Sequence, residues 1–283
     1  MDSAPESQTY SGHCAALQQE GSPLDKGKGK IEMGRILGVL NYKGGTGKTT
    51  TVVSLGAGLA SRGARVLCID LDAQGSLAMY LGIHYTYSLA HLLLEQAERQ
   101  ACIVQARDNL DLIASDGNLL QAEGELWRMD DSRRARRILV SKLRGLEDGY
   151  DYVILDFSPS ASLLSESGLL YVRELIVPVS MGYMALIGIR QVIETLKSVG
   201  QIPGHRIWFY LIIPTLYHAR LRQDREVLGI LQRRFANRVT EPIRANVRVS
   251  EAPSHHKTIY EYSPRSTGAA DYRRLVERVL RDG

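Results

Sequence analysis

Cysteine is scarce in this chain of 283 residues, and the positions of its cysteines argue against a disulfide framework and against a structural zinc site. The three cysteines, Cys14, Cys68 and Cys102, are widely spaced and form no C-x-x-C pair. A disulfide framework and a structural zinc site both need closely patterned cysteines, so neither is expected. A few unpatterned cysteines are typical of the reducing cytoplasm.

Long hydrophobic runs are also absent. No segment approaches the roughly 18 apolar residues that a membrane-spanning helix needs. The N-terminus lacks the basic stretch followed by an apolar one that marks a secretory leader. The composition, 44% hydrophobic and 23% charged, is that of an ordinary globular protein. We therefore expect a soluble, cytoplasmic protein.

Residues 1–33 have no hydrophobic periodicity. They are rich in Ser, Gly, Gln and charged residues and end in a polar run from Asp25 to Lys30. This composition predicts a flexible tail over 1–33. Residues 34–283 then form one domain of about 250 residues, because no linker or repeat interrupts them.

Short apolar runs alternate with amphipathic stretches from residue 35 onward. The apolar runs predict strands at 35–41, 65–72, 110–115, 152–157, 174–180 and 206–214. The amphipathic stretches predict helices at 48–62, 89–99, 132–146, 163–172, 184–199, 222–235 and 268–281. Continuous apolarity indicates strands buried on both faces. We expect an α/β fold: a single doubly wound, mostly parallel sheet with helices on both faces.

The strongest motif follows the first expected strand and opens the first expected helix. It reads Asn41-Tyr42-Lys43-Gly44-Gly45-Thr46-Gly47-Lys48-Thr49-Thr50. A glycine-rich turn there lets backbone N–H groups surround phosphates, and the helix N-terminus adds its positive dipole end. We expect residues 43–50 to bind ATP, with Lys48 on the β- and γ-phosphates and the Thr49 hydroxyl on Mg²⁺.

A later strand ends in a second metal-binding candidate. Residues 152–155 are apolar and lead into Asp156. A carboxylate at the carboxyl end of a strand, beside a phosphate loop, can hold Mg²⁺ through a water molecule. Thr49 and Asp156 are therefore the expected magnesium residues.

The phosphate loop departs from the usual G-x-x-x-x-G-K-[ST] pattern. Tyr42 stands where the first glycine would be, and a second lysine, Lys43, follows it. The string resembles the deviant loop K-G-G-x-G-K-T of the ParA/MinD family of ATPases. That resemblance implies a nucleotide-sandwich homodimer in which Lys43 reaches the phosphates of the other subunit. A second cation there would stabilise charge that develops on the transferring phosphoryl group.

Two further segments resemble motifs of the same family. Residues 70–75 resemble its D-x-D-P-Q-G element with Ala73 in place of proline, which implies that Asp72 activates the attacking water. Asp70 either supports the metal shell or caps the strand. Residues 156–160 resemble the D-x-P-P-S switch with Ser158 replacing the first proline. Lys43, Lys48 and Asp72 are the implied catalytic residues.

The C-terminal third carries a more specific resemblance. Residues 246–257 resemble the N-x-R-x-S-E-A-P-S-x-G-K segment of ParA/Soj partition ATPases, with His256 replacing the glycine. The resemblance implies that Arg220 and Arg248 lie on a DNA-binding face, and Lys257 fits the same role. The alternatives are an interhelical salt bridge with an acid such as Glu251 for Arg248, and no role in DNA binding for Arg220.

Charge is unevenly distributed along the chain. From residue 201 onward there are fifteen Lys and Arg against eight Asp and Glu, or +7, and the total of +4 leaves −3 for residues 1–200. Such asymmetry indicates an anionic polymer or membrane surface as a partner, or simply solvated helix faces rich in arginine.

These features, together with the resemblance to ParA/Soj ATPases, imply a Mg²⁺-dependent ATPase that hydrolyses ATP to ADP and phosphate. We expect it to form a homodimer with ATP, to bind double-stranded DNA non-specifically at the nucleoid, and to segregate or position a plasmid, chromosome or protein compartment. A ParB-like or other cargo adaptor would stimulate hydrolysis.

Two other classes of function are weighed against this one. The first is a MinD-like membrane-associated ATPase, for which the amphipathic segment 271–281 would be the anchor. Its few apolar residues are enough only to dock on the sheet, so membrane binding is not expected. The second is a metabolic enzyme of related fold. An iron–sulfur reductase needs a cysteine pair, and an ATP-dependent ligase needs a substrate pocket that no motif specifies.

Overall fold

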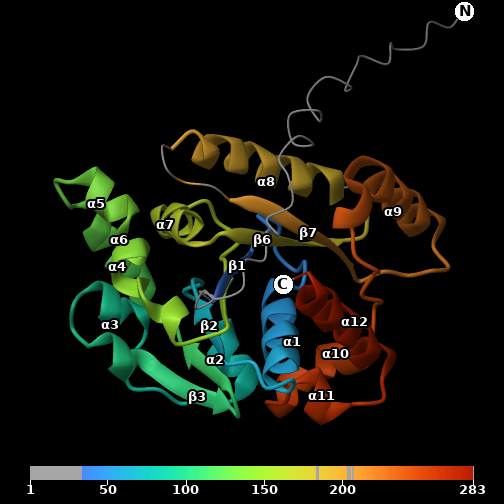
Figure 1. Cartoon of the computed structure of the whole chain (residues 1–283), viewed down its shortest axis with the longest axis horizontal. Helices are drawn as coiled ribbons and strands as arrows, with labels where there is room; N and C mark the ends of the chain where they lie inside the picture. The colour runs from blue at the N-terminus through green and yellow to red at the C-terminus, as the bar shows by residue number, and fades with distance from the viewer. Residues whose placement is uncertain (1–33, 183–184, 203–204, 206, 283) are drawn as a thin grey trace, which may run out of the picture. The chain divides into compact units, whose positions relative to one another are not determined.

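The protein is built on a seven-stranded sheet with the order β3-β4-β2-β5-β1-β6-β7 (Figure 1). This computed structural model describes residues 34–182, 185–202, 205 and 207–282, so the expected tail at 1–33 lies outside the described residues. The strands are β1 (Arg35–Val39), β2 (Val66–Asp70), β3 (Ile103–Arg107), β4 (Leu110–Ile113), β5 (Tyr152–Asp156), β6 (Glu174–Ser180) and β7 (Trp208–Thr215). All run parallel except β3, which pairs antiparallel with β4 at one edge.

Helices cover both faces of the sheet, which confirms the expected doubly wound α/β fold. One face packs against α1 (Lys48–Ala60), α2 (Ser76–Leu81), α10 (Val247–Glu251), α11 (Ile259–Tyr262) and α12 (Thr267–Arg281). The other carries α3 (Leu89–Leu93), α4 (Asn118–Trp127), α5 (Ser132–Arg136), α6 (Ile138–Leu143), α7 (Leu163–Tyr171), α8 (Ala185–Gly200) and α9 (Arg222–Phe235). Alternate residues of each central strand enter the two cores, so continuous apolarity follows from burial on both sides.

The register of the central strands places the expected site residues at one edge. Asp156 pairs with Val39 of β1 on one side and with Asp70 of β2 on the other. These three parallel strands therefore end at the same level. The loop before α1, the turn after β2 and the segment after β5 all emerge together at the carboxyl edge, where open α/β sheets bind ligands.

Helix α12 is tightly docked on α1. Its apolar residues Leu275, Val276 and Val279 are buried, and a Cβ at Gly58 of α1 would lie 2.4 Å from Val276. The apolar face of α12 is thus part of the core. Within the described residues, no helix has both the length and the apolarity to cross a membrane.

Some elements differ from the sequence expectation. The helix expected at 89–99 ends at Leu93, and the one expected at 132–146 is divided into α5 and α6. Asp131 caps α5 by accepting hydrogen bonds from the backbone of Arg133 and Arg134. The strand β3 and the short helices α2, α4, α10 and α11 were not expected.

Candidate nucleotide site

The loop between β1 and α1 has the backbone shape of a phosphate cradle. Gly45 and Gly47 adopt φ angles of +70° and +85°, in the left-handed region that favours glycine. A Cβ at Gly44 or Gly45 would meet no atom within 4 Å, so the space beside these two glycines is open. The N-terminus of α1 begins directly after Gly47 and directs its free N–H groups into the loop.

Two side chains that the sequence did not single out hold this loop in place. Asn41 is 2% exposed; its Nδ2 donates to the Pro178 carbonyl at 2.8 Å, and its Oδ1 accepts from the Lys43 amide at 3.0 Å. Thr215, at the end of β7, donates its hydroxyl proton to the Thr46 carbonyl at 2.8 Å. The Asn41–Pro178 and Thr215–Thr46 bonds are tertiary contacts, because each joins residues that are far apart in the chain.

The two lysines of the loop have different environments. Lys48 is buried, and its Nζ lies 3.5 Å from the Lys43 carbonyl. Burial lowers the pKa of Lys48, while the nearby carboxylates of Asp156 and Asp72 raise it. Lys43 is exposed, and its ammonium group makes no hydrogen bond or ion pair within the described part of the chain. A cation in that position is free to reach a ligand or another subunit.

Thr49 and Asp156, the two residues expected to hold magnesium, are in direct contact. The Thr49 hydroxyl donates to Asp156 Oδ2 at 2.6 Å. Asp156 is 1% exposed, and its Oδ1 has no hydrogen-bond partner among the described residues. Burial raises the pKa of Asp156 well above its usual value, and Asp70 raises it further. A buried carboxylate oxygen without a partner, beside a threonine hydroxyl, fits a hard cation such as Mg²⁺.

The two acids after β2 have separate roles. Asp70 is fully buried and accepts hydrogen bonds from the backbone of Asp72 at 2.9 Å and Leu77 at 3.0 Å. Burial raises the pKa of Asp70 to about 7. These contacts favour the capping alternative for Asp70. Asp72 is only half-buried, and its Oδ1 accepts from the Gln74 amide at 3.0 Å, so its carboxylate stays accessible to a ligand.

The departures from the family pattern are accommodated locally. Ser158 Oγ accepts from the Ser160 amide at 3.1 Å, so a hydroxyl holds the turn in the switch segment. His256, which stands where the family pattern has glycine, has a φ of +53°, in the left-handed region that favours glycine. Its Nδ1 lies 3.0 Å from the Met79 carbonyl, which fixes the turn against α2.

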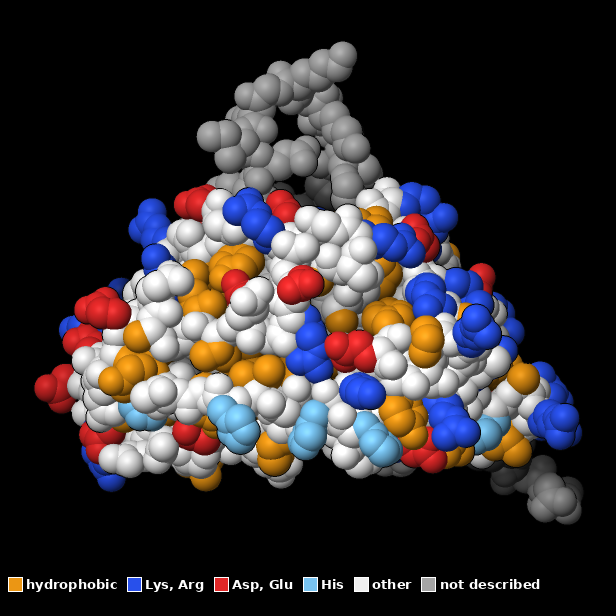
Figure 2. Space-filling view, turned by 90° about the horizontal axis from the view of Figure 1, so that it is seen from below, with side chains coloured by type: hydrophobic (Ala, Val, Ile, Leu, Met, Phe, Trp, Pro, Cys, Tyr) orange, Lys and Arg blue, Asp and Glu red, His pale blue; other side chains and the backbone are white. Residues whose placement is uncertain are grey.

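The expected DNA-binding residues are all exposed. Arg220 follows the carboxyl end of β7, and Lys257 follows the turn after α10. Arg248 does form an ion pair with Glu251, at 2.8 Å, but the pair lies within helix α10 and not between two helices. Glu251 also accepts a hydrogen bond from the Tyr262 hydroxyl. Seen from below the molecule, Lys and Arg side chains are most numerous toward the right-hand side (Figure 2).

Arg244 is also exposed, but its guanidinium group is held by a carboxylate on another element. It forms a bidentate ion pair with the buried carboxylate of Asp271 on α12, at 2.6 and 2.9 Å. It therefore holds α12 against the segment before α10.

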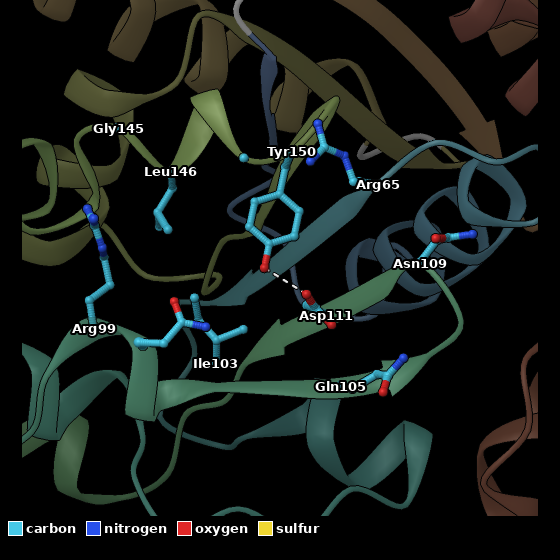
Figure 3. A pocket seen from close by; sticks show the side chains of 11 residues that line it. Arg65, Arg99, Ile103, Gln105, Asn109, Asp111, Gly145, Leu146 and Tyr150 are labelled. Atoms are coloured by element: carbon cyan, nitrogen blue, oxygen red, sulfur yellow. Dashed lines mark hydrogen bonds between the residues drawn. The ribbon is translucent and has the colours of Figure 1, made fainter.

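A hollow of about 480 Å³ lies at the opposite, amino edge of the sheet (Figure 3). Its lining includes Arg65, Arg99 and Ile103, and the Tyr150 hydroxyl donates to Asp111 at 2.7 Å beside it. The phosphate loop, Asp72 and Asp156 contribute nothing to it. This hollow is separate from the nucleotide site.

Comparison with known proteins identifies the family. The model of a family described as an AAA domain matches residues 34–206. The sporulation initiation inhibitor protein Soj of Bacillus subtilis is 37% identical over 257 residues, covering 89% of this chain and all of that protein. The chromosome-partitioning ATPase Soj of Thermus thermophilus is 37% identical over 247 residues, covering 87% of this chain and 95% of that protein. The chain belongs to the ParA/Soj-type ATPases.

A protein named for a different activity has the same fold. The cobyrinic acid a,c-diamide synthase of Mycobacterium smegmatis, with bound ADP and magnesium, superposes with a TM-score of 0.74 at 32% identity. The match covers 88% of this ParA/Soj-type chain and 95% of the synthase. The fold alone therefore does not decide between partition and amide synthesis.

Proposed function

We propose that this ParA/Soj-type ATPase binds ATP and Mg²⁺ and hydrolyses ATP to ADP and phosphate. Thr49 and Asp156 would hold the metal, which supplies positive charge to the β- and γ-phosphate oxygens. Lys48 would neutralise the same oxygens from the closed end of the loop. Asp72 would accept a hydrogen bond from the attacking water and hold it in line with the γ-phosphate.

The observation that carries the proposal is the exposed side chain of Lys43 beside the buried Lys48 and Asp156 and the half-buried Thr49. The buried Lys48 ammonium group lies inside the phosphate loop. The Lys43 backbone amide is held by Asn41, whereas the Lys43 side chain is exposed to solvent. This supports an ATP-dependent homodimer in which each Lys43 completes the site of the partner subunit. The closed dimer would be the state that ATP favours.

We further propose that the ATP dimer binds double-stranded DNA without sequence preference through Arg220, Arg248 and Lys257. The Arg248–Glu251 pair does not prevent this, because an exposed ion pair contributes little and yields readily to a phosphate. A ParB-like or other adaptor on a plasmid, chromosome or protein compartment would then stimulate hydrolysis and release the DNA. The sequence similarity to Soj proteins supports this cycle at the nucleoid.

The two competing functions have less support. A MinD-like membrane anchor would need the apolar face of α12, but its residues Leu275, Val276 and Val279 are buried against the domain. An amide synthase would need a substrate pocket beside the phosphates, and the hollow of Figure 3 lies at the opposite edge. Cys68 and Cys102 are both buried in the core, which is a poor position for a bridging iron–sulfur cluster.

Electrophoretic retardation of non-specific duplex DNA tests the proposal. Purified protein is assayed with ATP, ADP or no nucleotide, each at two salt concentrations. We expect retention only with ATP, and weaker retention at the higher salt. If ATP binds but no condition retains DNA, the DNA-binding part of the proposal is wrong and the matrix is another surface.

A further inference from the structure

Helix α4 carries an apolar stripe that none of the described residues covers. Leu120 and Trp127 are 66% and 67% exposed, although both side chains are large and apolar. They are seven residues apart, which places them on one face of the helix two turns from each other. Between them, a Cβ at Gly124 would meet no atom within 4 Å, so the surface there is open.

The opposite face of α4 is packed into the core through Leu119, Ala122 and Leu126. The helix is thus fixed by its buried side, and the exposed side is a stable surface. Clustered apolar side chains on the outside of a soluble domain mark an interaction site more often than an accident of composition.

The adjoining helix α5, which contacts α4 (Figure 1), is rich in arginine. Exposed arginines occupy four of the five positions 133–137. Arg136 faces Glu166 at 3.5 Å, but no described carboxylate lies within 4.0 Å of the Arg133 or Arg134 guanidinium group. The nearest acids along the chain are Asp130 and Asp131, and the Asp131 carboxylate caps α5.

The same helix is connected to the switch segment. Glu123 Oε1 of α4 accepts from the Leu164 amide in the first turn of α7 at 3.0 Å. One residue later, the Ser165 hydroxyl donates to the Ser160 carbonyl at 2.9 Å. Ser160 lies in the segment that leaves Asp156. Two hydrogen bonds therefore join α4 to the chain that follows the metal-binding aspartate.

We propose that the α4 stripe, formed by Leu120 and Trp127, together with Arg133 and Arg134 of the adjoining helix α5, is the docking surface for an acidic amphipathic helix of a partner protein. Its apolar residues cover the stripe and its carboxylates pair with the arginines. Docking acts on hydrolysis through Glu123 and the first turn of α7. This second step rests on the proposed ATPase function, whereas the docking itself does not.

Trp127 provides a direct reading of docking, because an exposed indole shifts its fluorescence emission when it is covered. The probe is a synthetic helical peptide of about 18 residues with leucines at i, i+4 and i+7 and glutamates on the flanks. A matched peptide carries lysine in place of each glutamate. We expect the glutamate peptide to shift the emission saturably and the lysine peptide to leave it unchanged.

Variants separate the two parts of the surface. Leu120→Ser should weaken the glutamate peptide about tenfold, and Arg133→Glu with Arg134→Glu should abolish its binding. Met79→Ser, at an equally exposed apolar residue on α2, is the matched control and should bind normally. Trp127→Phe should remove the emission change while binding persists by calorimetry. All replaced side chains are exposed, so folding is preserved.

Four results would overturn the docking proposal: equal binding of the lysine peptide, no binding of the glutamate peptide, an emission shift with duplex DNA, or the same shift on concentrating the protein alone. The coupling is tested separately by ATP turnover with and without the glutamate peptide. We expect a change of at least about fivefold that Glu123→Ala removes without weakening the peptide. A protein with no turnover at all would refute the ATPase proposal and leave the binding result standing.

Discussion

The role of Asp72 can be tested by a single substitution. Its carboxylate is accessible and is not needed to hold the loop, since its contact with the Gln74 amide is local. Asp72→Ala should therefore keep ATP binding and dimerisation while lowering turnover by about 100-fold or more. Asp108→Ala, at an exposed acid in the β3–β4 turn, should be silent. Loss of ATP affinity in Asp72→Ala would show that this residue binds rather than activates.

Asp156 makes the nucleotide-free protein sensitive to pH. Burial raises the pKa of Asp156 and brings that of Asp70 to about 7, so the folded state holds protons that the unfolded chain has released. The free energy of unfolding should then fall as pH rises from about 4 to about 7. Removing one buried carboxylate relieves this penalty.

Asp156→Asn should accordingly raise the melting temperature of nucleotide-free protein at pH 8 by about 3 °C or more, and much less at pH 5. The added stability that ADP with Mg²⁺ gives the wild type should be largely lost in the variant. Thermal melts across this pH range, with and without Mg²⁺, measure both effects. An undiminished Mg²⁺ effect would remove Asp156 from the metal site.

At the scale of elements, the end of β7 positions the phosphate loop through Thr215. Replacing the hydroxyl by a methyl group in Thr215→Val leaves the Thr46 carbonyl without its buried donor. Such a loss costs about 1–3 kcal/mol. We expect ADP affinity to fall about tenfold while the fold is retained, as calorimetry and circular dichroism would show. Thr240→Val, at a buried threonine outside the loop, should bind ADP normally.

The long elements could be predicted from sequence because their signals are local. Six strands have continuous apolar runs, and the glycine–lysine–threonine turn reveals the phosphate loop by itself. Strand β3 could not be predicted, because Ile103–Arg107 is an edge strand with mostly half-exposed residues and no continuous apolar run. Helices such as α11, with four residues, are too short to show a period of 3.6 residues.

The side chains that hold the phosphate loop in place could not be predicted from sequence, because their contacts are not local. Asn41 contacts Pro178, and Thr215 contacts Thr46, across more than one hundred residues of chain. No spacing rule joins such pairs before the strand order β5-β1-β6-β7 is known. The Arg248–Glu251 pair is the opposite case, since its spacing of three residues made the ion pair foreseeable.

At the scale of the whole molecule, the C-terminal excess of arginine should set the salt dependence of DNA binding. Each cation that contacts a phosphate releases counterions, so the slope of log affinity against log salt counts the contacts. Arg220→Ala, Arg248→Ala and Lys257→Ala should each reduce this slope by about 1. Arg65→Ala, at the amino edge of the sheet, should leave the slope unchanged.

Replacing Glu251 should change DNA affinity in the opposite direction, toward tighter binding. Its carboxylate lies 2.8 Å from the Arg248 guanidinium group and competes with a DNA phosphate for it. Glu251→Gln removes that competing charge and keeps the hydrogen bond from Tyr262, so ATP-dependent DNA affinity should rise severalfold at constant ATP affinity. Titrations at three salt concentrations would measure it. If Glu251→Gln weakens DNA binding while Arg248→Ala has no effect, Arg248 serves only as the partner of Glu251, and the DNA face lies elsewhere.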